Sequence, residues 1–386
     1  MENSSAHCVA SVEAVIVDLP LVREQRFAAL NARSQSMVLI FVRTSGGAEG
    51  VGEASLPSGP WWGGESVESI KIHVDEYLAP LMIGEDAFAL DAIMRKLDDA
   101  VFGNSFAKAG LEMALLDAQG KVLNTPVYNL LGGKARDSLP VSWPLATGDA
   151  NQEIEEALGK IEARLHNVFK LKMGAVEPAQ DVERACAIAR ALEGKATVRC
   201  DPNGRWDETT ATWAIPRLAD AGIDLIEQPL PRWNIEGCAR LTANCPMVHM
   251  LDESVCSLQD MQRIAQLRAG GLISLKLMKS GGMRRSKVIS ELALGAGIPV
   301  YMGTFLESSF GTGANMQFCA TLGDLPYGGE LAGALLVSES ITQRPADYHD
   351  FALHLQDGVG LGVEVDPDKL AAFRRDRNYS LHAVSS

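Results

Sequence analysis

Five charged side chains follow one another along this chain at intervals close to the length of one strand plus one helix. They are Lys172, Asp201, Glu227, Asp252 and Lys276, separated by 29, 26, 25 and 24 residues. Each comes at or near the end of a short apolar run, which is typical of a buried strand. Because the carboxyl ends of the strands in a βα repeat meet at one edge, we expect these five side chains to converge there.

The three acids of this series would repel one another strongly in a partly dry site unless a cation neutralised them. Carboxylate oxygens suit hard divalent ions, so Asp201, Glu227 and Asp252 predict a site for Mg2+ or Mn2+. Lys172 and Lys276 would flank that ion from opposite sides. We expect the neighbouring positive charges to depress the pKa values of both lysines, which readies one of them to donate or accept a proton.

The segment FKLKMG, residues 169–174, places a second lysine two positions before Lys172. Alternate residues of a strand point to the same face, so Lys170 and Lys172 share one face and Phe169 and Leu171 share the other. Two cations on one face of an otherwise apolar strand stand out in a chain with 35 basic and 49 acidic residues.

Each of these residues also has a structural interpretation. An aspartate after a strand often caps the next helix, as Asp252 would before SVCSL, and a single strand lysine usually extends its amine to solvent. The order Lys, Asp, Glu, Asp, Lys in register favours one common site over five separate structural roles. A noncatalytic barrel that only binds carboxylates stays open as an alternative of another class.

The elements that must position these residues alternate between strand and amphipathic helix from Leu139 onward, which predicts parallel strands with right-handed crossovers. About eight such units in roughly 200 residues favour a (β/α) TIM-type barrel over an open sheet. No GxGxxG follows the first strand, which disfavours a dinucleotide fold. The expected strands lie within residues 140–148, 167–174, 196–203, 223–230, 247–254, 271–279, 298–307 and 333–340.

The chain is long enough for more than the barrel. Before it, strand-like segments joined by a GG turn and then three helical patterns predict an α+β capping domain over residues 1–135. The barrel domain is expected over residues 136–340. Residues 341–386 are expected to return and pack on the N-terminal domain.

Composition narrows the class of partner. A net charge of -14 disfavours nucleic acid and an anionic membrane surface. The seven cysteines are scattered without a CxxC pair, which indicates reduced thiols rather than disulfides or a zinc cluster. The sequence shows no secretory signal pattern and no run of about 18 apolar residues, so we expect a cytoplasmic enzyme that acts on a small molecule.

The order of charged residues and the KxK pattern in FKLKMG resemble the enolase superfamily, which uses a Lys or His base with bound Mg2+, and within it the muconate lactonizing subgroup. The similarity covers nearly the whole chain. Further segments that carry it are GNSFAKAGLEMALLDAQGK, LLGGKARDSL, GIDLIEQP and YGGEL.

The resemblance implies a cycloisomerase that converts the dicarboxylate cis,cis-muconate to muconolactone in the breakdown of aromatic compounds, with Mn2+ or Mg2+ as cofactor. One carboxylate would attack the diene and give an enolate, which a lysine protonates. By the motif match Lys172 is the proton donor, and Lys170 orients it or lowers its pKa. Lys276 lies on the opposite face, where it either assists electrostatically or donates the proton in the other stereochemical course. Glu330, in YGGEL, matches an active-site acid, although a carboxylate at the rim that pairs with a lysine is an equal alternative. Family members form homo-oligomers, often octamers.

Substrate contacts are expected from Asn203, Glu307, Trp61 and Trp62, the two tryptophans as an apolar lid. Asn203 also has a turn-forming interpretation, and Lys279 is expected to face away from Lys276. Relatives with the same lysines and metal stay open: a chloromuconate cycloisomerase, a dipeptide epimerase or an o-succinylbenzoate synthase. Their substrate preference is expected to lie in the loops at residues 22–36 and 55–66.

Overall fold

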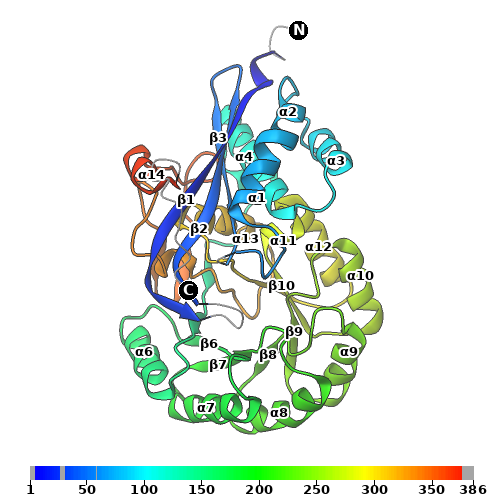
Figure 1. The fold of residues 1–386 in the computed structure, drawn as a ribbon, viewed down its shortest axis with the longest axis vertical. Helices are drawn as coiled ribbons and strands as arrows, with labels where there is room; N and C mark the ends of the chain where they lie inside the picture. Colours follow the sequence, from blue (N-terminus) through cyan, green and yellow to red (C-terminus); the bar gives the residue numbers. More distant parts are fainter. Residues whose placement is uncertain (1–4, 27–30, 58, 376–386) are drawn as a thin grey trace, which may run out of the picture.

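The computed structural model describes residues 5–26, 31–57 and 59–375 of the 386-residue chain. Its first part is a three-stranded antiparallel meander with helices beside it, shown at the top of Figure 1. The strands are β1 (Val9–Arg26), β2 (Asn31–Thr44) and β3 (Glu49–Ser55). The helices are α1 (Val67–Ile72), α2 (Ala79–Met82), α3 (Leu90–Ala100) and α4 (Ser105–Leu123), with a π-helical turn at His73–Leu78.

Helix α4 joins this cap to the rest of the molecule. Every residue from Phe106 to Gly120 is buried, as expected for a helix that is covered on all sides. One side of α4 packs on β2 and β3, and other contacts reach α11 and α12 of the second domain. The cap and the second domain therefore share one continuous core.

The second domain is a curled sheet of seven parallel strands surrounded by helices (Figure 1). The strand order β11-β10-β9-β8-β7-β6-β5 follows the chain, as right-handed βαβ units require. The strands are β5 (Trp143–Leu145), β6 (Val168–Lys172), β7 (Thr197–Asp201), β8 (Leu225–Glu227), β9 (Val248–Leu251), β10 (Leu272–Leu275) and β11 (Val300–Met302). The helices are α6 (Ala150–Glu162), α7 (Pro178–Ala191), α8 (Glu208–Asp220), α9 (Ile235–Asn244), α10 (Leu258–Leu267), α11 (Leu277–Ser280), α12 (Met283–Gly295) and α13 (Ser309–Cys319).

The two edges of this sheet are joined by a single segment. Gly329 forms parallel bridges to Val141, just before β5, and to Met302 at the end of β11. The expectation of an eighth strand at residues 333–340 is wrong, because Gly333–Leu335 forms a 3-10 helix. The backbone around Gly329 takes that place in the ring, so Glu330 follows it at the mouth of the barrel.

The C-terminal part returns to the cap, as the sequence predicted. Strand β13 (Ala352–His354) pairs with β4 (Ser138–Pro140) on one side and with β12 (Asp347–His349) on the other. Helix α14 (Pro367–Phe373) then lies against β1. The Arg375 guanidinium secures this contact through hydrogen bonds of 2.6 and 2.7 Å to the Asp18 carboxylate on β1.

The interior of the sheet has two levels. Leu225, Met250, Leu272 and Tyr301 form a separate apolar cluster inside the sheet, and the first three precede Glu227, Asp252 and Lys276 by two to four residues. The charged residues predicted to converge lie at the carboxyl ends of the strands. An apolar layer below thus supports a charged layer above, the arrangement in which barrel enzymes carry their chemistry.

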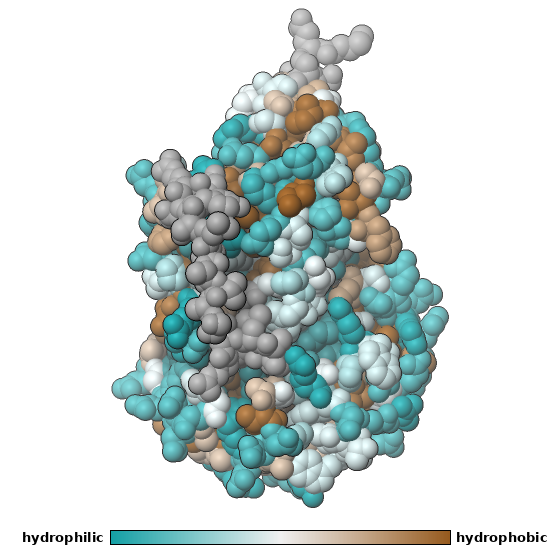
Figure 2. Space-filling view, viewed as in Figure 1, coloured by the Kyte–Doolittle hydropathy of each residue, from teal (hydrophilic) through white to brown (hydrophobic). Residues whose placement is uncertain are grey.

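The surface in view is mostly polar, and Figure 2 shows apolar residues gathered on the cap, near α1 and α2. Exposed apolar side chains there include Ile72, Tyr77 and Ile83. Within the described residues, no helix has both the length and the apolar character needed to cross a membrane.

The packing of β3 on α4 generates a first prediction. A Cβ at Gly52 would lie 2.0 Å from the Gly110 carbonyl oxygen and 2.8 Å from the Ala114 backbone nitrogen, so Gly52→Ala should destabilise the protein by about 3 kcal/mol. Gly159→Ala is the matched control, because nothing lies within 4 Å of that site on α6, and it should stabilise by up to about 1 kcal/mol. Urea unfolding midpoints measure both, and a Gly52→Ala midpoint equal to the wild-type value would contradict this packing.

Candidate active site

The structure brings the predicted series of charged residues to one end of the sheet. Lys172, Asp201 and Glu227 are the last residues of β6, β7 and β8. Asp252 and Lys276 come directly after β9 and β10. In the strand register Lys172 is the neighbour of Asp201, so the side chains project at the same level.

Each acid of the series is paired with an ammonium group. The Lys170 Nζ lies 2.5 Å from Glu227 and 3.7 Å from Asp201, and it also donates to Glu330. The Lys172 Nζ donates to Asp201 at 2.6 Å. The pairs lie on the Lys172 side of the site and are almost fully buried except for Lys172, whose side chain is 22% exposed.

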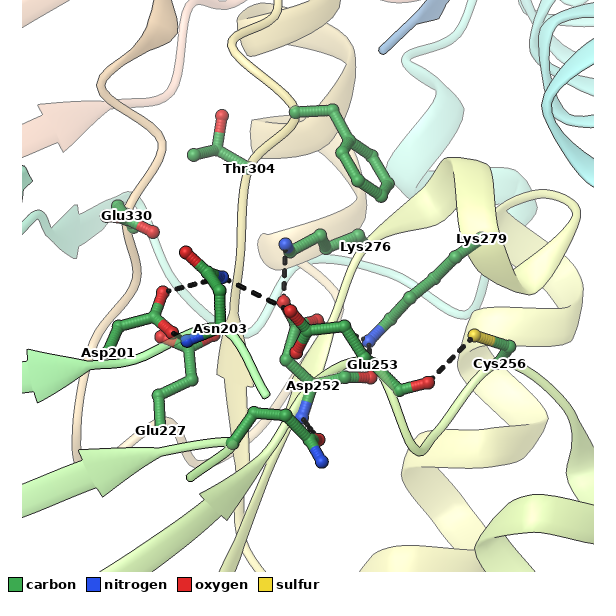
Figure 3. A network of polar contacts seen from close by, with 12 residues as sticks. Asp201, Asn203, Glu227, Asp252, Glu253, Cys256, Lys276, Lys279, Thr304 and Glu330 are labelled. Carbon is green, nitrogen blue, oxygen red and sulfur yellow. Dashed lines mark hydrogen bonds and ion pairs between the residues drawn. The ribbon is translucent and has the colours of Figure 1, made fainter. Parts of the chain in front are cut away.

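The opposite side of the site is built around Asp252 (Figure 3). The Lys276 Nζ donates to one carboxylate oxygen and the Lys279 Nζ to the other, both at 2.6 Å. Lys279 also donates to the Asp252 carbonyl oxygen at 2.6 Å. Lysines therefore approach the acids from two flanks, as the spacing predicted.

The electrostatics of the site follow from burial and charge pairing. Burial and the nearby Asp201 raise the pKa of Glu227 to about 8. Burial opposes the charge on Asp252, but Lys276 and Lys279 outweigh it and hold the pKa of Asp252 well below its usual value.

The expected depression of the pKa is not found at Lys276, and the pKa of Lys170 is raised as well. Burial lowers the pKa of each amine, but the carboxylates that face it raise the pKa by more than burial lowers it. The leading carboxylate is Glu227 for Lys170 and Asp252 for Lys276. The net pKa of both lysines is above the ordinary value because acids, rather than other cations, are their nearest neighbours.

Asn203 joins the two halves of the site. Its side-chain amide donates to the Asp201 and Glu253 carboxylates at 3.2 Å each. Its backbone N–H donates to Asp201 at 2.9 Å, and its φ of 46° is left-handed. Asn203 thus forms a turn through its left-handed backbone and also contacts two acids of the site through its side chain, so the two interpretations are compatible.

A small cavity of about 40 Å³ opens between the two lysine flanks and the cap. Lys172, Asn203, Lys276 and Glu330 lie in its wall. Its apolar wall consists of Pro57, Trp61, Trp62, Pro144, Ala146, Phe305 and Leu306, with Thr304 beside them.

The two tryptophans reach this cavity from the cap. Trp62 is buried, packs edge-on against Phe305 with ring centroids 4.6 Å apart, and lies 4.8 Å from the Lys276 amine. The Trp61 indole donates to the Pro57 carbonyl at 2.6 Å. Of the two loops expected to select substrate, residues 27–30 and Ser58 lie outside the described part.

Two predictions about individual residues are wrong. Lys279 does not face away from Lys276, because α11 begins at Leu277 and three residues of helix return to the same side. Glu307 does not end a strand, since β11 ends at Met302. Its carboxylate accepts hydrogen bonds from the Thr304 hydroxyl and the Phe305 backbone N–H instead, and it lies outside the cavity wall.

Glu253 is a site residue that sequence reasoning missed. It accepts the Asn203 amide, and burial together with Asp252 raises its pKa to about 7. The available signal was the pair of adjacent acids in LDES. In a strand they would point to opposite faces, but the chain turns after Leu251 and brings both to the site.

The donors present fit a hard divalent cation in chemical type. Asp201, Glu227 and Asp252 offer only oxygen ligands, and Glu227 Oε1 and Glu253 Oε2 are buried without a hydrogen-bond partner. In the described part no three such groups lie together as a ready metal site, and the Lys170 ammonium group lies between Asp201 and Glu227. Lysines and a cation compete for the same oxygens, so an ion would replace the direct lysine pairs.

Two family models match this chain. "Mandelate racemase / muconate lactonizing enzyme, N-terminal domain" matches residues 11–132, and "Enolase C-terminal domain-like" matches residues 152–369. The chain therefore belongs to the mandelate racemase and muconate lactonizing enzyme family of the enolase superfamily. Enzymes of this superfamily need a divalent metal.

Similar proteins narrow the group to cycloisomerases, which are isomerases. The chloromuconate cycloisomerase of Cupriavidus pinatubonensis is 51% identical over 94% of this chain and 97% of its own. Muconate cycloisomerase 1 of Pseudomonas putida is 46% identical over 95% of this chain and 98% of its own length. The solved structure of the muconate lactonizing enzyme of Pseudomonas fluorescens in complex with muconolactone has a TM-score of 0.94 and 44% sequence identity. The match covers 96% of this chain and 100% of that one.

The buried lysine at the centre of the site generates a second prediction. Lys170→Met would leave the Glu227 and Glu330 carboxylates without their ammonium partner, which should cost about 3–5 kcal/mol. Lys96→Met is the control, because the Lys96 pair with Glu85 is exposed and should contribute at most about 1 kcal/mol. Urea unfolding in EDTA compares the variants. Equal losses in the free energy of unfolding would show that the buried Lys170 pairs stabilise the protein no more than an exposed ion pair does.

Proposed function

We propose that this chain is a muconate cycloisomerase that converts cis,cis-muconate to muconolactone. One carboxylate oxygen adds to the conjugated diene, a C–O bond forms, and the resulting enolate takes a proton at carbon from a lysine, which solvent then reprotonates. The observation that carries the proposal is the pair of lysine flanks, Lys172 and Lys276, facing one cavity above buried acids. Proton donors on both sides suit a reaction that adds a proton to a flat enolate.

Lys172 is the proposed proton donor. It lies in the cavity wall, and its partly exposed side chain is held by one acid, Asp201. Lys170 is 1% exposed and faces three carboxylates, so its role is to orient the acids and Lys172. Lys276 faces the cavity from the other flank and stabilises negative charge there. Glu330 holds Lys170 in place.

Asp201, Glu227 and Asp252 are the proposed ligands of Mn2+ or Mg2+. When bound, the ion would supply positive charge that orients a substrate carboxylate and offsets the charge of the enolate. Asn203 holds the Asp201 carboxylate through its backbone and side chain. Trp61 and Trp62 exclude water from the cavity, which strengthens every charge interaction inside it.

A chloromuconate cycloisomerase is the second candidate. The 51% identical relative from Cupriavidus pinatubonensis carries that name, and the same acids and lysines would serve a chlorinated dicarboxylate. Turnover of muconate and chloromuconate by the purified protein, with a dipeptide as the control for the epimerase alternative, separates these activities.

We also propose that the enzyme is a cytoplasmic homo-oligomer, an octamer by family resemblance. None of the seven cysteines, all of which lie in the described part of the chain, forms a disulfide, as expected in a reducing compartment.

The proton-donor role generates a third prediction. Lys172→Ala should lower kcat for muconate by about 10²–10⁴-fold, since it removes a general acid, while the unfolding midpoint stays near that of the wild type. Lys96→Met on the cap surface should keep full activity. Turnover in D2O, with the deuterium position in the lactone read by NMR, follows the proton directly. Near-normal kcat in Lys172→Ala would transfer the role to Lys276.

The metal role generates a fourth prediction. Protein stripped with EDTA should lose muconate turnover and regain it with Mn2+. Asp201→Asn should weaken Mn2+ binding by more than about tenfold, since even outer-shell changes cost 10–100-fold. Asp207→Asn is the control, because Asp207 caps α8 on the surface and asparagine caps equally well. EPR titration of Mn2+ measures binding, and an unchanged titration would remove Asp201 from the ligand set.

A further inference from the structure

A second buried charged cluster lies behind the lysine-bearing strand β6, outside the site described above. It consists of Glu153 on α6 and Asp181 and Arg184 on α7. The Arg184 guanidinium pairs with both acids, at 3.0 Å to Asp181 Oδ1 and closely to Glu153 Oε2. The Arg184 side chain is 10% exposed, and the two acid side chains are almost fully buried.

This cluster holds the backbone of two loops at the mouth of the barrel. Arg184 Nη2 donates to the carbonyl oxygen of Lys172 at 2.7 Å. Asp181 Oδ2 accepts the Gly174 backbone N–H at 2.7 Å. Glu153 Oε1 accepts the backbone N–H groups of residues 147 and 148 at 2.9 Å each. The loops after β5 and β6 are therefore tied to one guanidinium and its acids.

Packing alone does not fix Lys172 from this side. A cavity of about 470 Å³ lies next to the cluster, and its wall includes Lys172, Gln180 and Arg184. On the other side the chain is tight, because Gly174 has a φ of +86° and a Cβ there would lie 2.8 Å from the Pro202 carbonyl oxygen. Toward β7 the Met173 N–H donates to the Asp201 carbonyl oxygen at 2.9 Å, whereas toward the cavity Arg184 holds the Lys172 carbonyl oxygen.

We propose that Arg184 is a positioning residue that fixes the proton-donating lysine through its backbone carbonyl. The guanidinium reaches Lys172, Asp181 and Glu153 at once because its donors form a rigid fork. Without this tie the end of β6 can move toward the cavity and carry the Lys172 amine away from the reacting carbon. Misplacement of a catalytic group by about 1 Å can cost 10²-fold in rate. This inference rests on the proposed function of Lys172.

The test compares Arg184→Met and Arg184→Lys with the wild type as Mn2+-loaded enzymes. Arg240→Met is the matched control, because Arg240 pairs with Glu208 on the outer surface of the barrel. Arg184→Met should lower kcat for muconate by about 10–100-fold with little change in KM or Mn2+ affinity. Arg184→Lys keeps the charge and the fold but cannot bridge three acceptors, so it should lie between Arg184→Met and the wild type.

A second readout does not depend on turnover. Lysines are methylated reductively with 13C-formaldehyde, and the Lys172 NMR resonance is identified by its loss in Lys172→Ala. This resonance should shift in Arg184→Met and stay in place in Arg240→Met. A lower melting temperature with unchanged kcat, pH profile of kcat and Lys172 resonance would overturn the inference, since the cluster would then be only structural.

The two readouts also separate this inference from the proposed function. A wild-type protein that does not turn over muconate refutes the function. If its Lys172 resonance still shifts in Arg184→Met, the tie between Arg184 and Lys172 stands. An unchanged resonance refutes the tie whatever the activity.

Discussion

Burial of several carboxylates together with several ammonium groups at one end of a parallel sheet is the constraint on which this structure depends. Five acids, Asp201, Glu227, Asp252, Glu253 and Glu330, meet four lysines there. The acids exceed the lysines by one charge if all are ionised. Burial first, and then the neighbouring acids, raise the pKa values of Glu227 and Glu253. The excess of acids makes the mouth of the barrel suitable for a divalent cation.

The rest of the fold keeps this charged layer dry and in place. The apolar layer of Leu225, Met250, Leu272 and Tyr301 closes the sheet from below. The cap closes it from above through Trp62, which packs on Phe305 and lies beside the Lys276 amine. In such surroundings charge interactions are stronger than in water, which serves binding of a dicarboxylate as well as proton transfer. The cluster of Glu153, Asp181 and Arg184 is a second set of buried charges next to this layer. Its hydrogen bonds hold the backbone of the loops after β5 and β6 in place.

Comparison of individual residues shows which inferences local rules support. The same-face placement of Lys170 and Lys172 follows from the two-residue period of a strand, and both indeed face buried acids. The same rule failed at Lys279, because a turn of helix begins between the two lysines of KLMK. It failed again at Glu307, where the strand ends five residues earlier than its apolar run indicates. Local periodicity predicts orientation only as far as the element itself continues.

The sequence by itself determined the alternation of strands and helices, the barrel class, the capping domain and the recurrence of charged residues at strand ends, because these depend on short-range periodicity and on the length of one βα unit. Only the tertiary structure decided which groups meet. Lys170 pairs with Glu330 across 160 residues, Gly329 rather than residues 333–340 joins the sheet edges, and Arg184 reaches the Lys172 carbonyl from a helix. The physical reason is that such contacts depend on how separate elements pack, and the residues near each partner in the chain carry no signal of it.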